Sequence, residues 1–458
     1  MQNFINIERV EAKKRGYVER VKDYREVYEI KTTADASEQS SRCIQCGDPY
    51  CHNKCPLHNY IPFWLKAVAK NDFDLAFKFS NETNPFPEIT GRVCPQDRIC
   101  EGDCTLSDGY GAITIGAIEI AITEEGFKKG LKPKFAQKSI GKSVAIIGSG
   151  PASISAATYL LRAGFNVRMY EKDARAGGLL TYGIPEFKIQ KDVVQRRVNF
   201  LTEAGMQLYV NKEVGKDISF EEIVNENDAV FVGIGAGESN KANVLNENAK
   251  GTYLAIDFLK NIQEKHFGET DKYISVKDKN VVVIGGGDTA MDCLRVSIRE
   301  GAKSVKCLYR RDKYNMPGSK KEFKNALEEG VEFIYNVALK DIVVNNSNQA
   351  IGVTLQKTIL GEKDESGRQK VEIVKSSDFK MDAEVIIFAL GFSASTPSFL
   401  LENGIELNKY GNIITNNYKT SKNGVYAGGD CVNGADLVVT AAADGKGAAM
   451  QIIREILG

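Results

Sequence analysis

Seven of the ten cysteines in this 458-residue chain lie between residues 43 and 104. The first four are spaced C-x2-C-x4-C-x3-C-P, at Cys43, Cys46, Cys51 and Cys55. The other three are Cys94, Cys100 and Cys104. Clustered thiolates are typical ligands of soft metals and iron–sulfur centres, and this spacing is close to the bacterial ferredoxin run C-x2-C-x2-C-x3-C-P. The pattern therefore predicts iron–sulfur chemistry.

Zinc and disulfide bonds are the alternative uses of these cysteines. A structural zinc site is built from C-x2-C pairs, and the second group of cysteines contains no such pair. A disulfide framework suits small secreted chains, whereas the first ten residues here include no apolar signal segment. Both alternatives are weaker than the iron–sulfur interpretation.

The number of cysteines raises the question of an eighth ligand. In the ferredoxin run the fourth cysteine binds the other cluster of a pair, and two four-iron clusters need eight ligands. Glu119, a carboxylate in the apolar, helix-compatible stretch 112–127, is one candidate. A glutamate on a helix surface is the other interpretation, and carboxylates are rare on such clusters, so the residues alone leave the choice open.

A dinucleotide-binding fingerprint follows the cysteine region. It comprises an apolar strand run at 144–147, then Gly148, Gly150, Pro151 and Ser153 opening a helix, and Glu171 at the end of a second strand. The first glycine permits the tight turn, and the second lets the backbone approach a pyrophosphate at the helix N-terminus. The acidic residue accepts hydrogen bonds from ribose hydroxyls. This pattern favours FAD or NAD, although Ser153 replaces the usual third glycine.

A second fingerprint begins after the strand run at 281–284. Its turn and first helical residues are Gly285, Gly286, Gly287, Asp288 and Thr289. The following strand ends not in an acid but in Arg310 and Arg311, and an arginine at this place accommodates the 2′-phosphate of NADP. Two surface arginines at a strand end are the alternative. We expect the second site to prefer NADPH.

The C-terminal part carries a further flavin signal. Gly429 and Asp430 follow a short strand and precede an apolar helix at 441–457, so Asp430 could reach ribityl hydroxyls while the helix directs its N-terminal dipole at the flavin ring. Apolar strand runs at 229–235 and 385–391 suggest that the second nucleotide-binding domain is inserted into the first. Segment 339–380 alternates apolar and polar residues, which is typical of a β-meander.

Composition narrows the classes of function. Lys plus Arg and Asp plus Glu balance at 60 each, which gives no indication of a nucleic-acid partner. No apolar run is long enough for a membrane span, and we expect a cytoplasmic protein. Only three histidines are present, so we expect cofactors rather than protein side chains to perform the chemistry. Residues 1–40 are highly charged and predict a solvated helical lead-in, with a partner-binding face as the alternative.

From about residue 40 onward the chain resembles the small (β) subunits of bacterial NADPH-dependent glutamate synthases. The stretches that carry the resemblance are Cys43-Ile-Gln-Cys-Gly-Asp-Pro-Tyr-Cys51, Thr90-Gly-Arg-Val-Cys-Pro-Gln-Asp-Arg98, Gly177-Gly-Leu-Leu-Thr-Tyr-Gly-Ile-Pro185, Tyr309-Arg-Arg-Asp312 and Asn315-Met-Pro-Gly-Ser319. The third stretch adds Gly178 and Leu179 to the expected FAD-binding residues.

The resemblance implies an α/β architecture of the adrenodoxin-reductase type behind an all-helical iron–sulfur domain. We expect two [4Fe-4S] clusters in residues 1–140, FAD-binding parts at 141–270 and 383–458, and an inserted NADPH-binding domain at 271–382. One cluster would take Cys43, Cys46, Cys51 and Cys104, and the other Cys55, Cys94, Cys100 and Glu119.

The implied activity is electron transfer from NADPH through FAD and the clusters to a large (α) subunit, which makes glutamate from glutamine and 2-oxoglutarate. A related NADPH:ferredoxin-type or pyrimidine-reducing flavoprotein subunit and a non-enzymatic iron–sulfur scaffold are the alternatives. A disulfide reductase is disfavoured because the FAD region has no C-x-x-C or C-x4-C pair.

Overall fold

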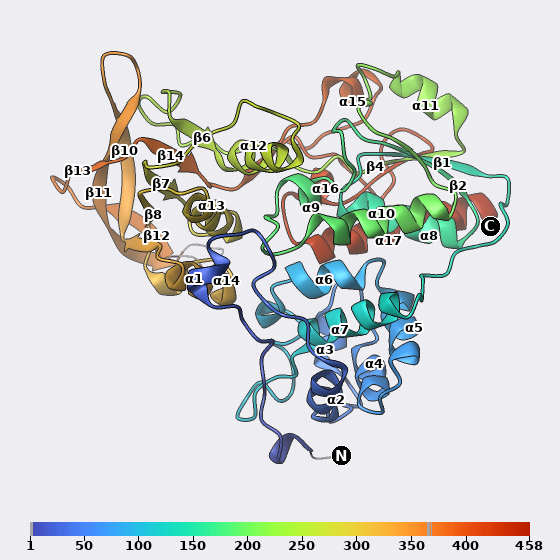
Figure 1. Cartoon of the computed structure of the whole chain (residues 1–458). Coiled ribbons are helices and arrows are strands. Elements are labelled where there is room, and N and C mark those ends of the chain that lie inside the picture. Colours follow the sequence, from blue (N-terminus) through green and yellow to red (C-terminus); the bar gives the residue numbers. More distant parts are fainter. Residues whose placement is uncertain (1–2, 364–366, 368) are drawn as a thin grey trace.

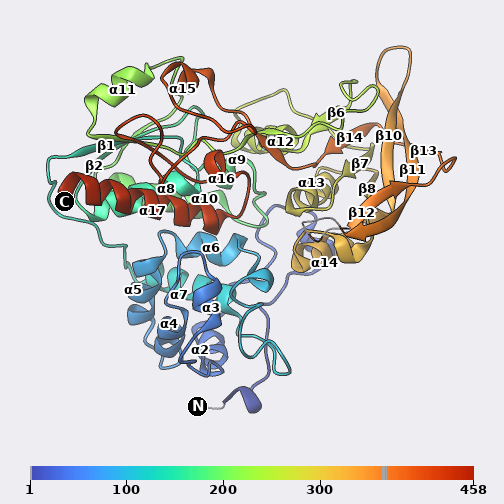
Figure 2. The same cartoon turned by 180° about the vertical axis from the view of Figure 1, so that it is seen from behind.

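A computed structural model of the chain describes residues 3–363, 367 and 369–458. A helical unit formed by the N-terminal part lies below two α/β units that stand side by side (Figure 1). The view from behind shows the same three-part arrangement, with the C-terminal helix α17 on the unit that contains β1 and β2 (Figure 2). The described residues thus confirm the expected fold class, a helical region followed by two nucleotide-binding α/β units.

The helical unit is organised around Trp64, whose side chain is fully buried. Thr32 and Asp72 cap their helices by accepting hydrogen bonds from the backbone N–H groups of Asp35 and Leu75. The helices of this unit are α2 (Thr33–Ser41), α3 (Tyr50–Lys54), α4 (Ile61–Val68), α5 (Phe73–Thr83), α6 (Pro87–Val93) and α7 (Ile115–Lys128). The helix expected in the stretch 112–127 corresponds to α7.

The first α/β unit contains a five-stranded, wholly parallel sheet in the order β16-β4-β1-β2-β3. Its strands are β1 (Ser143–Ile147), β2 (Asn166–Tyr170), β3 (Gln207–Tyr209), β4 (Ala229–Val232) and β16 (Val425–Ala427). Its helices are α8 (Pro151–Arg162), α9 (Leu179–Tyr182), α10 (Lys191–Glu203), α11 (Phe220–Glu226), α15 (Ser398–Glu402), α16 (Asp430–Asn433) and α17 (Val438–Leu457).

Both faces of this sheet are buried, which explains the continuous apolar run at β1. Val144 and Ile146 face the core formed with α8, α10 and α17, whereas Ala145 and Ile147 face the core formed with α11 and α15. Parallel strands covered by helices on both sides need apolar residues at successive positions. The strand run that precedes the first glycine turn is therefore a consequence of its central place in the sheet.

The second α/β unit repeats this plan with the parallel order β6-β14-β7-β8-β9. Its strands are β6 (Thr252–Leu254), β7 (Asn280–Ile284), β8 (Ser304–Tyr309), β9 (Glu332–Tyr335) and β14 (Val385–Phe388). Its helices are α12 (Ala255–Phe267), α13 (Asp288–Arg299) and α14 (Lys320–Glu328). Helices cover the face that carries Val281 and Val283, and an antiparallel sheet covers the face that carries Val282 and Ile284.

That antiparallel sheet corresponds to the expected β-meander. It consists of β10 (Val337–Val344), β11 (Ala350–Lys363), β12 (Gln369–Ile373) and β13 (Phe379–Asp382). Two further short strands, β5 (Gly237–Ser239) and β15 (Phe392–Ala394), pair antiparallel where the chain passes between the two α/β units. Because β16 and α17 return to the first sheet, the second unit is inserted into the first.

Sheet membership corrects two of the expected domain limits. The segment of β6 and α12 was assigned to the FAD part 141–270, and β14 to the part 383–458, but β6 and β14 pair with each other and with β7 in the second sheet. A buried parallel strand has the same apolar pattern in either sheet. The sequence therefore indicated β14 without identifying the sheet that contains it, and it did not indicate β6.

The charged N-terminal segment is not a solvated helical lead-in. Residues 7–31, here called the N-terminal strap, contain only one short helix, α1 (Tyr17–Arg20), and run along the second α/β unit. Arg20 is 1% exposed and donates to Glu329 and Glu328 at 2.8 and 2.9 Å. The Val27 N–H donates to the Phe187 carbonyl of the first α/β unit. Arg20 and Lys14 of the strap thus pair with carboxylates of the second α/β unit, whereas Lys13 pairs within the strap and is 78% exposed.

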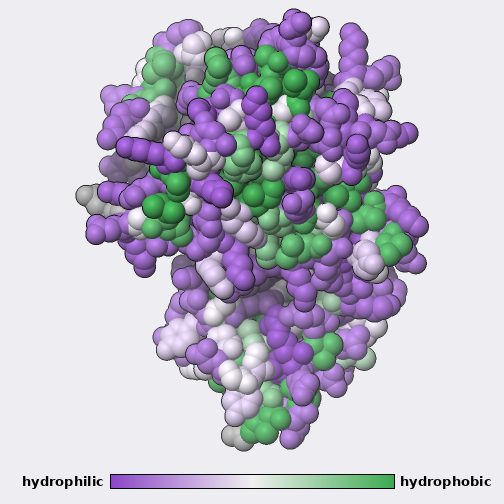
Figure 3. All heavy atoms as spheres, turned by 90° about the vertical axis from the view of Figure 1, so that its left-hand side faces the viewer, coloured by the Kyte–Doolittle hydropathy of each residue, from purple (hydrophilic) through white to green (hydrophobic). Residues whose placement is uncertain are grey.

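On the side of the antiparallel sheet, polar residues predominate and apolar side chains gather in small areas, with a waist above the helical unit (Figure 3). Ile351, Ile359 and Ile373 are the exposed large aliphatic residues of β11 and β12. Among the described residues, no helix has the length and apolar character needed to cross a membrane.

Candidate functional site

Four of the cysteines face a common pocket in the helical unit. Cys43, Cys46, Cys51 and Cys104 line it together with apolar side chains such as Leu65 and Ile113. Burial, followed by the neighbouring cysteines, raises the pKa of the Cys51 thiol to about 12. A positively charged metal centre reverses such a preference, because coordinated thiols are deprotonated. The donor set and its apolar wall therefore fit an iron–sulfur centre.

The remaining three cysteines of the region lie near Glu119. Burial is the largest cause that holds the pKa of the Cys94 and Cys100 thiols well above its usual value, and the charge of Glu119 contributes to both shifts. The pKa of the Cys55 thiol is likewise raised, by burial first and by the charge of Glu119 as well. The seven cysteines thus divide into two sets, and the second includes the predicted carboxylate.

Glu119 is buried, so the structure does not place it on a helix surface. Burial raises its pKa to about 8, against the effect of its hydrogen bonds. Asn59 and Asn84 donate side-chain N–H groups to Oε1 at 2.9 and 3.2 Å, and Thr90 donates its hydroxyl to Oε2 at 3.2 Å. These three donors come from separate segments, and the sequence analysis did not identify them.

A lysine of the C-terminal helix also approaches the second set. Lys446 of α17 donates to the Leu57 carbonyl at 3.4 Å and lowers the pKa of Cys55 electrostatically, although burial outweighs it and raises that pKa. Within the described part of the chain, no three His, Cys, Asp or Glu side chains converge tightly enough to hold a single metal ion. The hydrogen bond from Lys446 to Leu57 brings helix α17 of the first α/β unit into contact with the surroundings of Cys55.

The first glycine turn has the conformation that its sequence predicts. Gly148 has a φ of +91°, and a Cβ there would lie 2.5 Å from the Gly233 carbonyl oxygen. Gly150 precedes α8 and has open space where a Cβ would project, and Pro151 is the first residue of the helix. The small Ser153 donates to Gly233 at 3.4 Å. The open N-terminus of α8 fits an approaching pyrophosphate.

Glu171 lies beside this turn in a hydrogen-bonded pocket. Ser149 donates its hydroxyl to Glu171, and the Asp173 N–H donates to the other carboxylate oxygen at 2.8 Å. Burial raises the pKa of Glu171. Ser149 also accepts from the Gly177 N–H at 2.9 Å, a link that the sequence analysis did not identify. The residue predicted to bind a ribose is therefore held at the edge of the turn.

Two of the remaining predicted FAD-binding residues, Gly178 and Gly429, lie against the same helix end. A Cβ on Gly178 would lie 3.0 Å from Gly150 Cα, and one on Gly429 would lie 3.0 Å from Ala152 Cβ. Leu179 begins α9 with its side chain 45% exposed. Asp430 begins α16, and burial raises its pKa to about 7.

Helix α17 begins at Val438, three residues before the expected start, and packs on α8 at a glycine. A Cβ on Gly445 would lie 1.9 Å from the Ala152 carbonyl oxygen, so the backbones of the two helices are in contact there. This close approach brings Gly429 and Asp430 beside the first glycine turn.

The second glycine turn is built in the same way. Gly285 has a φ of +141°, and a Cβ there would lie 2.2 Å from the Ala389 carbonyl oxygen at the end of β14. Gly286 lies against the Tyr309 ring, and Gly287 precedes α13 with open space beside it. Asp288 and Thr289 form the first turn of that helix. The turn and helix end again fit a pyrophosphate.

The two arginines after β8 differ in their surroundings. Arg311 donates from Nε to the Gln369 carbonyl oxygen at 2.9 Å, so its side chain is directed to β12. Arg310 is exposed, and among the described residues its guanidinium forms no hydrogen bond or ion pair. Its backbone carbonyl accepts from Thr358 at 2.9 Å. Arg310 is therefore the better placed of the two to bind an anion from solution.

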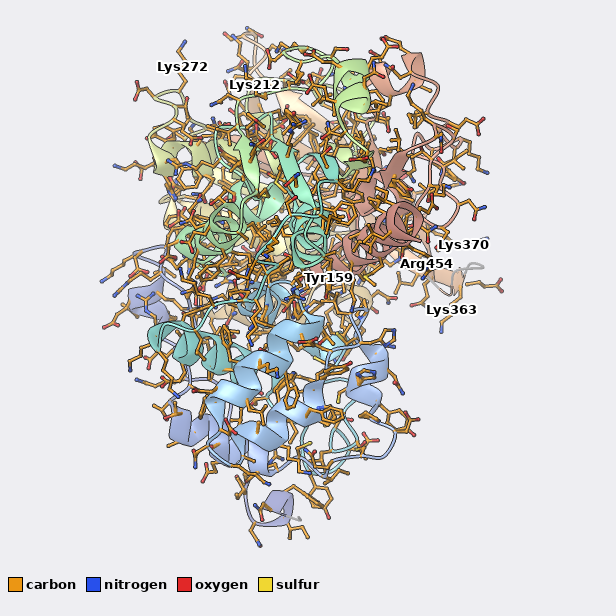
Figure 4. All side chains as sticks on the ribbon, turned by 90° about the vertical axis from the view of Figure 1, so that its right-hand side faces the viewer. Tyr159, Lys212, Lys272, Lys363, Lys370 and Arg454 are labelled. Carbon is orange, nitrogen blue, oxygen red and sulfur yellow. The ribbon has the colours of Figure 1, made fainter. Side chains whose placement is uncertain are left out.

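Buried contacts join the helical unit to the α/β units. Tyr159 of α8 donates to the Thr83 carbonyl at 2.9 Å, and Figure 4 shows this tyrosine at the boundary between the two units. Arg197 of α10 forms a double hydrogen bond with Glu88 of α6, at 2.7 and 2.6 Å, and both side chains are fully buried. The metal-binding candidates and the first glycine turn are thus parts of one packed structure.

Comparison with known proteins agrees with this arrangement. Residues 20–131 match the family described as dihydropyrimidine dehydrogenase domain II, 4Fe-4S cluster, and residues 142–445 match the pyridine nucleotide-disulphide oxidoreductase family. Among solved structures, FprA of Mycobacterium tuberculosis in complex with NADPH is 18% identical with a TM-score of 0.59, over 69% of this chain and 84% of that chain. At this identity, the likeness shows the fold alone.

Similar proteins extend over the whole chain. The protein named glutamate synthase [NADPH] small chain in Escherichia coli (strain K12) is 45% identical, and the match covers 97% of each chain. The small chain of Azospirillum brasilense is 40% identical over 98% of this chain and 95% of its own. The putative oxidoreductase AegA of Escherichia coli (strain K12) is 43% identical over 97% of this chain but only 68% of its own. This chain belongs to the family of NADPH-dependent glutamate synthase small chains.

Proposed function

We propose that this chain oxidises NADPH and delivers the electrons to the large chain of a glutamate synthase, which makes L-glutamate from L-glutamine and 2-oxoglutarate. One observation carries this proposal: a single chain combines two cysteine sets with two glycine turns, and it matches the Escherichia coli small chain over 97% of that chain's length. The chemistry supplied by the bound groups is hydride transfer from NADPH to FAD and one-electron transfer through iron–sulfur clusters.

In this proposal the first α/β unit holds FAD. Gly148 and Gly150 admit the pyrophosphate to the N-terminus of α8, and Glu171 accepts hydrogen bonds from the ribose. Glu171 suits this role because Ser149 and Asp173 fix its carboxylate beside the turn. Asp430 directly follows Gly429, which lies against Ala152 of α8, and is proposed to bind the ribityl chain. No protein side chain is assigned a proton-transfer role.

The second α/β unit holds NADPH through its glycine turn and Arg310. The turn formed by Gly285, Gly286 and Gly287 admits the pyrophosphate, and the exposed Arg310 guanidinium binds the 2′-phosphate. Arg311 is proposed to support that phosphate from its place against β12. The absence of an acidic residue at this strand end favours NADPH over NADH.

We assign two [4Fe-4S] clusters to the two cysteine sets. The first would be held by Cys43, Cys46, Cys51 and Cys104, which line one pocket. The second would be held by Cys55, Cys94, Cys100 and the ionised Glu119, whose carboxylate is already fixed by three neutral donors. All ten cysteines are free thiols, which suits the reducing cytoplasm that we propose as the location of the protein.

The NADPH site is tested by Arg310→Ala. Loss of a hydrogen bond between ions should lower kcat/KM for NADPH about 10- to 100-fold and leave that for NADH nearly unchanged. The exposed Lys313→Ala serves as a control for a change of surface charge in the same loop. An equal decrease in kcat/KM for both coenzymes would show that Arg310 does not bind the 2′-phosphate.

The whole function is tested by anaerobic NADPH oxidation with the purified large chain. We expect oxidation to require that chain together with glutamine and 2-oxoglutarate, and one glutamate to appear from each substrate. If only artificial acceptors are reduced, this chain delivers its electrons to a partner other than the large chain. The putative oxidoreductases AegA and UacF are 43% and 42% identical to this chain, so acceptors of that class are the second candidates.

A further inference from the structure

Arg98 connects the cysteine region to the second glycine turn. It lies between Cys94 and Cys100, yet its side chain leaves the helical unit and reaches the second α/β unit. Nη1 donates to the Pro317 carbonyl oxygen at 2.7 Å, and Nη2 pairs with Asp288 Oδ2 at 2.8 Å. The segment that supplies two proposed cluster ligands therefore contacts the nucleotide-binding loop directly.

The carboxylate of Asp288 lies beside the glycine turn that is proposed to bind the pyrophosphate. Asp288 is the first residue of α13 and directly follows Gly287, where the pyrophosphate of NADPH would lie. A helix N-terminus attracts anions, but a carboxylate there competes with a bound phosphate and repels it. Pairing with Arg98 neutralises this carboxylate and adds a cation to the site.

Arg98 also closes a ring of contacts around the turn. The Ser319 N–H donates to Asp288 Oδ1 at 2.8 Å, and the Gly318 N–H donates to the Gly286 carbonyl at 3.0 Å. A Cβ on Gly318 would lie 3.0 Å from that same carbonyl oxygen, so the two loops are in close contact. Since Arg98 binds Pro317 as well as Asp288, its side chain links the loop 316–319 to the start of α13.

The exposure of this ion pair indicates what it contributes. The side chains of Arg98 and Asp288 are 40% and 35% exposed. Ion pairs exposed to this extent contribute little to the stability of a fold. A charge near an anion-binding turn, in contrast, changes ligand affinity directly. The pair is therefore better explained by nucleotide binding than by folding.

We propose that Arg98 is a positioning residue of the NADPH site, supplied by the iron–sulfur part of the chain. It neutralises Asp288 and holds the loop 316–319 against the glycine turn, so that the pyrophosphate of the coenzyme can bind there. The inference rests on the proposed function, because it assumes that the second turn binds NADPH. It adds a residue that neither fingerprint contains.

The test measures the Kd for NADP⁺ and the KM for NADPH and NADH in the full chain with its bound groups. Arg98→Ala should raise the Kd for NADP⁺ about tenfold, as expected for one unneutralised charge beside an anion. Because the pyrophosphate is common to both coenzymes, KM should rise for NADPH and NADH alike, with kcat nearly unchanged. Iron and FAD contents should equal those of the parent protein.

A second substitution separates charge from structure. Asp288→Asn removes the charge but keeps an oxygen that can accept from Ser319, so the double variant Arg98→Ala/Asp288→Asn should regain most of the lost affinity. Lys129→Ala is the matched control, because this lysine is 44% exposed and pairs with Asp74 within the helical unit. It should leave the Kd for NADP⁺ unchanged.

Two results would overturn the inference. An unchanged Kd in Arg98→Ala would exclude a role in binding, and a raised Kd without recovery in the double variant would exclude neutralisation of Asp288. If Arg98→Ala has no effect while Arg310→Ala selectively weakens NADPH, only this inference fails. If neither variant alters coenzyme binding, the proposed NADPH site itself fails.

Discussion

Cys100 provides the most direct test of the division of cysteines into two sets. Its thiol is buried, and its pKa is raised by burial and by neighbours that include Cys55, Cys94 and Glu119. If it binds one of two four-iron clusters, Cys100→Ala should remove about half of the iron. Iron analysis and absorption spectra of anaerobically purified protein measure this loss.

Cys293→Ala is the control for that measurement, because Cys293 is also buried but lies in α13, away from both sets. It should keep all of the iron. An unchanged iron content in the Cys100 variant would remove this residue from the proposed ligands.

His266 is expected to give the stability a dependence on pH. Burial lowers its pKa, but the carboxylates of Glu186 and Glu300 outweigh burial and raise the pKa from 6.5 to about 9. The folded protein therefore binds the proton more tightly than the unfolded chain does. This stabilisation is fully present below pH 6.5 and is lost as the pH rises through about 9.

Melting temperatures between pH 6 and pH 9.5 test this expectation. The decrease in Tm across that range should be smaller in His266→Gln than in the parent protein. Identical decreases in the two proteins would show that His266 does not carry the effect.

At the scale of residues, the sequence indicated those candidate site residues that are close together along the chain. The cysteine runs and the two fingerprints are local patterns, and the structure brings the members of each together. The donors to Glu119 were not predictable, because Asn59, Asn84 and Thr90 meet it only after several helices have packed. Arg98 was within a recognised motif, but its contact with Asp288 spans 190 residues.

At the scale of elements, the contact between α8 and α17 depends on one glycine. An alanine at position 445 would place its Cβ 1.9 Å from the Ala152 carbonyl oxygen, which neither backbone can avoid without moving. We expect Gly445→Ala to destabilise the protein by about 1–3 kcal/mol, as overpacking generally does. Because α17 follows Asp430, the FAD content should also fall.

Thermal unfolding and flavin absorbance measure the two effects. Met450→Ala is the control on the same helix, since the Met450 side chain is 47% exposed. Its unfolding free energy should stay within about 0.5 kcal/mol of the parent value. Full FAD occupancy and normal stability in Gly445→Ala would contradict the close packing.

The strands show where prediction of elements ended. Apolar runs correctly indicated β1, β4, β7 and β14, because central parallel strands bury both faces. For the same reason the sequence did not show that β14 pairs with β7, since a strand that is apolar on both faces fits either sheet. Sequence analysis could therefore predict an insertion but placed its limits in the wrong sheet for β6 and β14.

At the scale of the whole molecule, Arg197 and Glu88 hold the helical unit to the first α/β unit. Both side chains are fully buried and joined by two hydrogen bonds of 2.7 and 2.6 Å. Arg197→Ala would leave the Glu88 carboxylate buried without its cation, which typically costs about 3–5 kcal/mol. Chemical unfolding followed by both iron and flavin signals measures the loss.

The pair Lys132–Glu203 supplies the comparison, because it joins the same two units at the surface, with side chains 60% and 54% exposed. Lys132→Ala should change the unfolding free energy by about 1 kcal/mol or less. Equal effects of the two substitutions would show that burial of the ion pair does not determine its importance.

The N-terminal strap was the part of the fold that the sequence did not predict. Its dense charges suggested contact with water, because a charge pattern along the chain does not reveal partners that are distant in sequence. Arg20 finds its partners in Glu328 and Glu329. Arg295 and Arg299 also bind Glu329. The strap could be placed only once α13 and α14 were known.

The ion pair between Arg20 and Glu329 also sets an order of events during synthesis. The two residues are 309 positions apart. At about 5–20 residues per second, Glu329 is made roughly 15–60 s after Arg20. The segment around Arg20 therefore reaches its final contacts only after α14 has been made. A chain that ends before α14 would leave the Arg20 guanidinium without both of the carboxylates that it binds in the folded protein.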